Sequence, residues 1–345
     1  MNKLSLLKPF IKTDVFDQCT ITSITDDSRD VQINSLFVAR QGAGMHGKEF
    51  VKDAVKKGAS CVISDQIIHH EIDIPIFYID ELEDLITKIL FSFYNLSESD
   101  FIFFGVTGTN GKTTTAFMAH NMLRELQRPS VYVGTLGAIL NDDLVETKGN
   151  TTPGIFELFK ILKDCKFQQK TYVFLEISSH ALTQKRLSNL VFSQTLLLNI
   201  QSDHLDYHKT ETNYINAKLS ITDLNSTNPT IILIDQMQDI LPSLSDDQKK
   251  QLSKSRLLSA ANLSAEFKYF IEYNPEGHSK IGLNFPNFSL EMSVLLFLKF
   301  NIENYISAIA LISEHVSPND LKKTSKTEIK LPKGRGEILS LKQGK

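Results

Sequence analysis

The segment GVTGTNGKTTT, Gly105 to Thr115, joins an apolar run to a run with helical spacing. FIFFGV (101–106) has the length and composition of a buried strand, and KTTTAFMAHNML (112–123) reads as the start of a helix. Glycines let the intervening backbone approach a ligand closely, and the free N–H groups at a helix start attract anions. The segment therefore predicts a phosphate-binding loop. The usual pattern, Gly, four residues and Gly-Lys-Ser/Thr, would nevertheless require glycine where Val106 stands.

Strand-like and helix-like runs alternate around this segment. Strands are expected at 101–106, 130–136, 171–177, 194–200 and 230–235. Helices are expected at 112–128 and 155–164, where apolar residues recur every three or four positions. Such alternation is typical of a mostly parallel sheet, which binds ligands beyond the carboxyl ends of its strands.

A smaller series of the same kind precedes the segment. Short apolar runs at 35–40, 59–65 and 74–80 surround a helix-like run at 47–59, and the polar stretch NLSESD (95–100) then interrupts the pattern. We therefore expect an α/β protein. Its parts are a small N-terminal α/β domain (1–97), a P-loop-like central domain with a mostly parallel sheet flanked by helices (98–330), and a linker (331–345).

The last hundred residues give a weaker signal. SDDQKKQLSKSR (245–256) reads as exposed helix or loop, and FNIENYISAIALISEHV (300–316) predicts an amphipathic helix. No strand is predicted here.

Composition excludes several classes of protein. The chain has 345 residues, of which 41% are hydrophobic and 22% charged, enough for two cores. Its net charge of −3, without blocks of like charge, argues against nucleic acid or a membrane as the partner. Three widely spaced cysteines suit a reducing compartment, and the N-terminal apolar stretch is too short for a signal peptide. We expect a cytoplasmic monomer.

LEISSHALTQKR (175–186) places Glu176 near the end of an apolar strand. A carboxylate there needs a positive partner, either a metal ion or a lysine. Ser178, Ser179 and His180 follow, but the G-x-S-x-G elbow of a serine hydrolase is missing.

NIQSDHLDYH (199–208) follows another apolar strand, with His204 and His208 four residues apart. The spacing allows a zinc site or a solvated polar loop, and without a matched third ligand it decides neither. Because Gly108–Thr113, Glu176 and His204 each follow a predicted parallel strand, we expect them to converge at one edge of the sheet.

Two further segments are ambiguous by themselves. In TNYINAKLSITDL (212–224) the inward residues are expected to be Tyr214, Ala217 and Leu219, with Lys218 beside them as an ordinary surface lysine. KGNTTPG (148–154) is a polar loop suited to hydrogen-bonding a polar ligand.

Together these motifs resemble the Mur ligase family, and within it the MurE type. The resemblance covers nearly the whole chain and rests on DDSRDVQINSLFVARQGAGMHGKEF, GTNGKTT, NTTP, LEISSHALTQKRL, NIQSDHLDYH, NYINAK, FNIEN and GRGE. The phosphate loop of that family is G-x-x-G-K-[ST], which accounts for Val106.

The resemblance implies an ATP-dependent amide ligase of peptidoglycan precursor synthesis, active in the cytoplasm with Mg²⁺. Such an enzyme adds meso-diaminopimelate or lysine to UDP-MurNAc-L-Ala-D-Glu through an acyl phosphate, which the amine of the amino acid then attacks. Two other functions stay open. One is a non-catalytic protein that binds nucleotide or precursor, and the other is a P-loop phosphohydrolase or kinase.

The resemblance also implies roles for individual residues. Those implied to bind ATP are Gly108, Thr109, Asn110, Gly111, Lys112, Thr113, Thr114, Asn304 and Arg335. Those implied to hold metal are Thr113, Glu176, His204 and Lys218, the last as a carbamate. Those implied in catalysis are Lys112, Glu176, His204 and Lys218. Those implied on the uridine side are Asp26, Ser28, Ala43, Gly44 and Met45, of which Asp26 and Ala43–Met45 depart from the usual residues. Those implied on the muramoyl-dipeptide side are Asn150, Thr151, Thr152, Ser178, Gln184 and Arg186.

In MurE-type ligases a third domain follows the linker motif, here GRGE (334–337), and carries the amino-acid site. Only eight residues follow the motif in this sequence. We therefore expect this polypeptide alone not to form the amide bond at a useful rate. An excised fragment, a natural truncation and one half of a split enzyme all fit that expectation.

Overall fold

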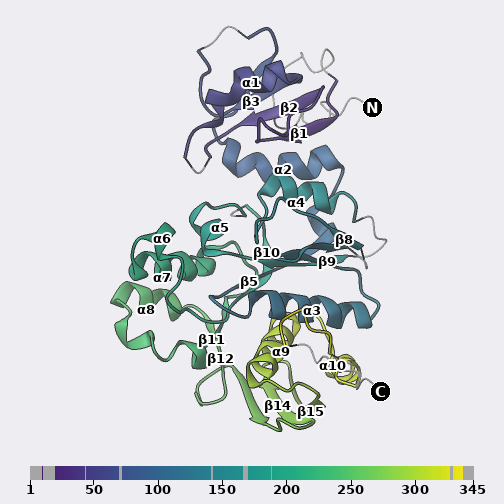
Figure 1. Ribbon diagram of the computed structural model, residues 1–345, viewed down its shortest axis with the longest axis vertical. Helices are drawn as coiled ribbons and strands as arrows, with labels where there is room; N and C mark the ends of the chain where they lie inside the picture. Colours follow the sequence, from purple (N-terminus) through teal and green to yellow (C-terminus); the bar gives the residue numbers. More distant parts are fainter. Residues whose placement is uncertain are drawn as a thin grey trace, which may run out of the picture. The chain divides into compact units, whose positions relative to one another are not determined.

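In the computed structural model of the chain, the described residues are 10, 20–42, 44–69, 72–140, 143–165, 170–187, 189–326 and 329–336. They fall into two compact units (Figure 1). The first consists of the described residues of Met1–Asp100 and Gly154–Lys166, and the second of those of Phe101–Pro153 and Phe167–Lys345.

The first unit contains a four-stranded parallel sheet in the order β1-β2-β3-β4. Its strands are β1 (Ser23–Thr25), β2 (Ser35–Ala39), β3 (Ala59–Ser64) and β4 (Ile76–Tyr78). Its helices are η3 (Gly47–Phe50), α1 (Val51–Lys56), α2 (Leu82–Tyr94) and α4 (Ile155–Leu162). Phe37, Val51 and Val62 form the centre of its core. The strands of a parallel sheet are apolar on both faces, so helices must cover both faces. This requirement explains the predicted alternation of strands and helices.

Helix α4 belongs to the first unit although it is distant in sequence from the small sheet. The Phe159 ring meets the Phe91 ring of α2 edge-on, with centroids 4.7 Å apart. The Arg40 guanidinium lies over the Phe156 ring at 5.6 Å. Aromatic contacts of this kind add to the burial of apolar area.

The second unit is built on an eleven-stranded sheet in the order β15-β14-β13-β12-β11-β10-β5-β9-β6-β7-β8. Its first strands in sequence are β5 (Phe101–Thr107), β6 (Ser130–Gly134), β7 (Gly137–Leu140), β8 (Asp143–Val145), β9 (Thr171–Glu176) and β10 (Phe192–Leu197). The others are β11 (Ile231–Leu233), β12 (Arg256–Ser259), β13 (Phe267–Glu272), β14 (Ser279–Phe285) and β15 (Phe288–Val294). The strands from β6 through β13 in this order are parallel, and antiparallel hairpins extend both ends. The predicted fold class, a mostly parallel central sheet flanked by helices, is confirmed.

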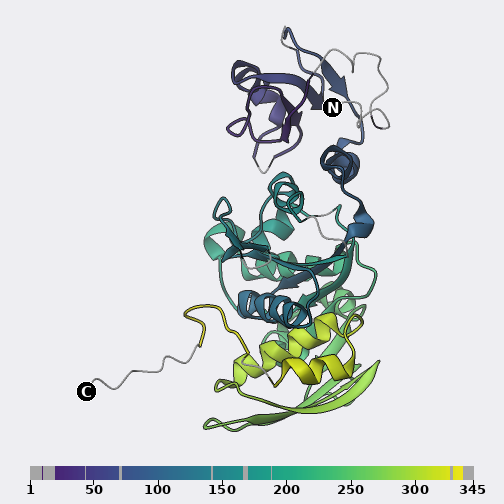
Figure 2. The ribbon, with the colours of Figure 1, turned by 90° about the vertical axis from the view of Figure 1, so that its right-hand side faces the viewer.

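Helices α3 (Lys112–Glu125) and α9 (Lys299–Ile312) pack side by side on one face of this sheet (Figure 1). On its other side α9 meets the inner face of the hairpin of β14 and β15, and α10 (Pro318–Thr324) contacts β15 (Figure 2). The helix predicted in 300–316 is confirmed, but it is not amphipathic: eleven residues of α9 are buried, including Asn301, Asn304 and Ser307. The helix is enclosed by neighbours on several sides, so it has no broad polar face.

The remaining short helices are α5 (Ser179–Thr183), α6 (Leu205–His208), α7 (Glu211–Leu219), α8 (Asp246–Leu252) and η6 (Ile234–Met237). Helix α7 contacts α5, α6 and α8. Of the two alternatives for 245–256, exposed helix or loop, the structure has a helix, α8, whereas the four strands β12 to β15 were missed. Among the described residues, no helix has both the length and the apolar composition needed to cross a bilayer.

Candidate functional site

Three neighbouring parallel strands bring the predicted residues together. Strand β5 lies between β10 and β9, and the register aligns Thr107 with Leu197 and Val106 with Glu176. The loops that follow these three strands therefore leave the sheet at the same edge. The expected convergence of the phosphate loop, the Glu176 segment and the His204 segment on this edge is confirmed.

The phosphate loop is held in shape by the segment after β10. The backbone N–H of Thr109 donates to the Asn199 carbonyl at 3.1 Å, and that of Asn110 donates to Asn199 Oδ1 at 2.9 Å. Gly111 caps helix α3 with φ of 85°, a conformation that favours glycine, and a Cβ there would lie 2.6 Å from Asn304 Oδ1. The loop is therefore fixed before any ligand arrives, and the two glycines bracket it as the short motif predicts.

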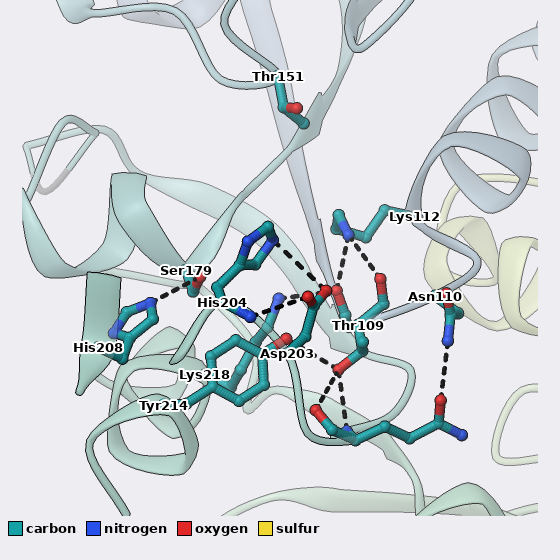
Figure 3. A network of polar contacts seen from close by, with 12 residues as sticks. Thr109, Asn110, Lys112, Thr151, Ser179, Asp203, His204, His208, Tyr214 and Lys218 are labelled. Carbon is teal, nitrogen blue, oxygen red and sulfur yellow. Dashed lines mark hydrogen bonds and ion pairs between the residues drawn. The ribbon is translucent and has the colours of Figure 1, made fainter. Parts of the chain in front are cut away.

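Lys112, the first residue of α3, folds its side chain back over the loop (Figure 3). Its Nζ donates to the carbonyls of Gly108 at 2.8 Å and Thr109 at 3.0 Å. Burial lowers the pKa of this ammonium group, and the charge of Arg335 lowers it further, whereas Glu176 and Asp203 raise it. The first N–H groups of α3 lack intrahelical acceptors, so the backbone and Lys112 form one donor set suited to phosphate.

The Glu176 carboxylate is fully buried and is surrounded by neutral donors. Its Oε2 accepts from Thr113 Oγ1 at 2.9 Å, and its Oε1 accepts from the Thr135 N–H at 3.0 Å and from the Tyr132 hydroxyl. Within the described residues no lysine or arginine forms an ion pair with it. The lysine-paired alternative is therefore wrong.

Because Gly134 has no side chain, it leaves room for the Glu176 carboxylate. A Cβ at Gly134 would lie 2.1 Å from Glu176 Oε1, which no side chain could tolerate. Tyr132 and Thr135 were not predicted, although Tyr132 lies within the strand predicted at 130–136 and Thr135 lies near its carboxyl end. The rule that ligands meet the carboxyl ends of strands could have indicated Thr135.

Lys218 is buried, with 1% of its surface exposed, so the prediction of an ordinary surface lysine is wrong. Its Nζ donates to the Gly108 carbonyl at 2.7 Å and lies 5.5 Å from the centre of the Tyr214 ring. Burial lowers its pKa well below the usual value, and the positive charge of Lys112 lowers it further. As predicted, Tyr214, Ala217 and Leu219 are buried, and the Tyr214 hydroxyl forms a hydrogen bond with Thr109 Oγ1 of the loop at 2.9 Å.

The histidines after β10 form a separate group beside the loop (Figure 3). His204 is half exposed with φ of 51°, and its Nε2 lies 3.5 Å from Asp203 Oδ2. His208 is buried and pairs its Nε2 with Ser179 Oγ at 3.0 Å. The part of the chain that the structure describes contains no group of three or more His, Cys, Asp or Glu that could hold a metal ion. The zinc interpretation therefore finds no support.

Residues predicted to face the dipeptide gather after β9. Thr152 Oγ1 donates to the Glu176 carbonyl at 2.8 Å and accepts from the Ser178 N–H at 2.9 Å. Arg186 Nη1 donates to the Thr152 carbonyl at 2.6 Å, and its Nε donates to Gln184 Oε1 at 2.9 Å. The other two predicted residues are Thr151, 3.2 Å from Thr135 Oγ1, and the exposed Asn150.

A cavity of about 490 Å³ opens beside the start of α3. Its lining residues are Asn110, Gly111, Thr114, Asn199, Gln201, Leu233, Gln236, Phe300, Glu303, Asn304, Gly334, Arg335 and Gly336. Asn304 and Arg335 were predicted as nucleotide contacts and both line it, next to the loop. Gln236, Phe300 and Glu303 were not predicted, because their helices, η6 and α9, are far from the loop in sequence. Glu337 of the linker motif lies outside the described residues.

The residues predicted for the uridine side lie in the first unit. Asp26 pairs with Arg40 Nη2 at 2.8 Å, and the Ser28 carbonyl accepts from Lys57 Nζ at 3.0 Å. Gly44 and Met45 are exposed, and Ala43 lies outside the described residues.

Family models identify the family to which this chain belongs. A profile described as "Mur ligase middle domain" matches residues 106–312, and one described as "Mur ligase family, catalytic domain" matches residues 20–79. The chain belongs to the Mur ligase family. Its phosphate loop, Glu176, Lys218 and Asn304 all lie within the matched middle domain.

Two relatives within the Mur ligase family carry the same printed name, "UDP-N-acetylmuramoyl-L-alanyl-D-glutamate--2,6-diaminopimelate ligase". The protein from Cytophaga hutchinsonii is 37% identical over 218 residues, covering 63% of this chain and 44% of the relative. The protein from Bacteroides thetaiotaomicron is 32% identical, covering 83% and 58%. This chain therefore spans about half the length of these relatives.

Solved Mur ligase structures share the fold. A structure of a ligase with the same printed name has a TM-score of 0.70 at 22% identity, covering 96% of this chain and 67% of the other. A MurF structure from Acinetobacter baumannii has a TM-score of 0.64 at 19% identity, covering 99% and 71%. At these identities the likeness concerns the fold alone.

Proposed function

We propose that this chain provides the ATP site and the uridine-nucleotide site of a MurE-type ligase. The reaction is the ATP-dependent addition of meso-diaminopimelate or lysine to UDP-MurNAc-L-Ala-D-Glu in the cytoplasm. The relatives' printed names support the acceptor and the first of these amino acids. Because the chain spans about half their length, the ligation is proposed for the whole protein.

The observation that carries the proposal is the buried Lys218 amine on the phosphate loop. A general phosphohydrolase has no need of a second lysine there. Because its pKa is well below the usual value, this lysine has more of the neutral amine that attacks CO₂. The amine nitrogen would bond to the CO₂ carbon and lose one proton, which leaves a carbamate anion in place of an ammonium group.

Thr113 and Glu176 fit a magnesium ion. Hydroxyl and carboxylate oxygens are the ligands that Mg²⁺ prefers, and Thr113 Oγ1 and Glu176 Oε2 lie 2.9 Å apart at the loop. A carbamate on Lys218 would add anionic oxygen, and His204 is the remaining predicted ligand. When bound, Mg²⁺ would neutralise charge on the phosphates. Tyr132 and Thr135 hold the Glu176 carboxylate in place beforehand.

The chain's own donors would then position the phosphates. Lys112 Nζ rests on two loop carbonyls, so it can exchange these acceptors for phosphate oxygens. The first N–H groups of α3 point to the same place, and charge that develops during phosphoryl transfer is stabilised by such fixed donors. Arg186, bound to Thr152 beside Glu176, supports a place for the substrate carboxylate.

The test is Lys218→Ala in the ligase containing this chain. We expect amide formation, measured as ADP release that depends on the amino acid, to fall at least a hundredfold. Partial recovery with formate or another short carboxylate would support the carbamate. The matched control is Lys249→Ala, an exposed lysine on α8 that should keep full activity. Unchanged activity of Lys218→Ala would favour the phosphohydrolase instead.

Isothermal titration supplies a second, independent test. UDP-MurNAc-L-Ala-D-Glu and Mg²⁺-ATP are titrated separately into the purified chain. Binding of both is expected. Absence of binding to the uridine nucleotide would remove both the ligase and the precursor-binding interpretation.

A further inference from the structure

The short helix α5 leads into Gln184 and Arg186, two of the residues implied on the muramoyl-dipeptide side. The helix has five residues, and Gln184 is its C-cap. Lys185 follows with φ of 50°, and the Arg186 N–H donates to the Ala181 carbonyl at 3.0 Å, which ends the helix in a Schellman motif. A helix this short has little stability of its own, so its position depends on what packs against it.

Helix α6 packs against α5 through two consecutive residues. At the start of α5, His208 Nε2 pairs with Ser179 Oγ at 3.0 Å (Figure 3). The ring of Tyr207 lies on the ring of His180, with centroids 4.0 Å apart and planes inclined by 37°. The Tyr207 hydroxyl lies 3.2 Å from Gln184 Nε2. Tyr207 therefore joins α6 both to the body of α5 and to its C-cap.

The hydrogen bonds of Gln184 can run in only one direction. An arginine side chain has donors and no acceptor, so the oxygen of the Gln184 amide must face Arg186 Nε, 2.9 Å away. The amide nitrogen then faces the Tyr207 hydroxyl, which accepts its N–H. The hydroxyl thus anchors the part of the Gln184 amide that Arg186 does not bind.

The Arg186 guanidinium is held at two of its nitrogens. Gln184 binds Nε, and the Thr152 carbonyl accepts from Nη1 at 2.6 Å. Thr152 is itself fixed, because its Oγ1 donates to the Glu176 carbonyl at 2.8 Å. Two contacts at different nitrogens set the plane of a guanidinium, and a guanidinium whose plane is set in advance binds a carboxylate at a lower cost in conformational entropy.

We propose that Tyr207 is a positioning residue for the precursor. Its hydroxyl anchors Gln184, Gln184 orients the Arg186 guanidinium, and the guanidinium receives a carboxylate of UDP-MurNAc-L-Ala-D-Glu. This inference rests on the proposed function for the precursor and adds the residue that prepares Arg186 for it. Tyr207 acts through Gln184 and Arg186, so removal of its hydroxyl should weaken precursor binding without removing a substrate contact.

The experiment is isothermal titration of UDP-MurNAc-L-Ala-D-Glu into the purified chain and into its Tyr207→Phe variant. Phenylalanine keeps an aromatic ring on His180 and removes only the hydroxyl. We expect the dissociation constant for the precursor to rise about three- to tenfold, within the range of one neutral hydrogen bond. Affinity for Mg²⁺-ADP should be unchanged. A displacement of α6 would lower that affinity too, because His204, the predicted metal ligand, is the N-cap of the same helix.

A double-mutant cycle separates positioning from packing. Arg186→Ala is expected to weaken precursor binding by itself and to leave the contacts on the uridine side, so that binding stays measurable. In that background Tyr207→Phe should cause no further loss, because the hydroxyl acts through the guanidinium.

Tyr273→Phe is the matched control. It removes the hydroxyl of a tyrosine that is also partly exposed and that donates to the Phe297 carbonyl at 2.7 Å. It should keep wild-type affinity for the precursor. Circular dichroism and urea unfolding establish that each variant folds.

The outcomes separate the two proposals. Three results would overturn the positioning role and leave the proposed function standing: unchanged precursor affinity in Tyr207→Phe, an equal loss in the Arg186→Ala background, or a matching loss of Mg²⁺-ADP affinity. If the wild type did not bind the precursor, the precursor site of the proposed function would be overturned, and the positioning role with it.

Discussion

The central sheet has a parallel half around β5 and an antiparallel half formed by β14 and β15, and the two differ in where they place polar side chains. Strands β5, β9 and β10 are parallel and buried on both faces, and their carboxyl ends hold the phosphate loop, Glu176 and the His204 segment. Strands β14 and β15 are antiparallel, alternate buried with exposed residues, and end in turns. The difference teaches that parallel pairing concentrates polar side chains at one edge, whereas the hairpin spreads its polar residues over a solvent face.

Two glycines, one in each half of the sheet, illustrate this difference. Gly134 lies against the Glu176 carboxylate, and Gly282 lies against the ring of Phe270. Glu176 is fully buried and fixed by several donors, whereas Phe270 is 49% exposed. The same added methyl group should therefore have very different consequences in the two halves.

Gly134→Ala is expected to have the largest effect. The new Cβ would overlap Glu176 Oε1, and the buried carboxylate has nowhere to move without losing its donors. We expect unfolding free energy to fall by about 1–3 kcal/mol, as for other overpacked cores, and Mg²⁺-ATP affinity to fall at least tenfold. Urea unfolding and isothermal titration measure the two. If the variant bound Mg²⁺-ATP with wild-type affinity, the observed position of the Glu176 carboxylate would not be required for nucleotide binding.

Tyr132→Phe should have the next largest effect. It removes one donor to a buried carboxylate, a hydrogen bond that contributes about 1.5–3 kcal/mol when its partner is charged. We expect lower stability in urea and a higher Mg²⁺ concentration at half-maximal ATP binding. Tyr273→Phe, which removes a hydroxyl bonded to the Phe297 carbonyl near the hairpin, is the control and should leave ATP binding unchanged.

A substitution of His315 probes the amino ends of the parallel strands, the sheet edge opposite the phosphate loop. Its ring packs edge-on against Phe104 and Tyr172, and its Nε2 pairs with Ser193 Oγ at 2.8 Å. Burial lowers its pKa in the folded chain below the ordinary 6.5, so the unfolded chain binds a proton first as pH falls.

Stability should therefore decline as pH falls below about 6.5, and His315→Asn should weaken that dependence. Unfolding free energy in urea is measured at several pH values for both proteins. A variant with the same pH dependence as the wild type would show that other groups cause it. Mg²⁺-ATP affinity should be unchanged, because this edge carries no part of the phosphate site.

Gly282→Ala should have the smallest effect. The exposed ring of Phe270 covers this glycine, and the ring can rotate away into solvent. We expect the unfolding free energy to change by less than about 1 kcal/mol, with ATP affinity unchanged. A loss as large as that of Gly134→Ala would break the contrast between the two halves of the sheet.

The parallel half was predictable because its signals are local and strong. Bounded apolar runs marked β5, β9 and β10, and the glycines and Lys112 marked the start of α3. Strands β12 to β15 were missed, since their alternating pattern is weaker and their polar residues resemble those of loops. For α9 the sequence suggested a polar face that the fold buries between α3 and the hairpin.

The sequence by itself determined the strand, loop and helix around Gly108 and the order in which the site's segments follow strands, because these depend on neighbours in the chain. Only the tertiary structure decided that Lys218 is buried on the loop and that Glu176 is held by Tyr132 and Thr135. Each of these contacts joins residues far apart in sequence. Burial and pairing across such distances depend on how strands are ordered in the sheet, which no local pattern encodes.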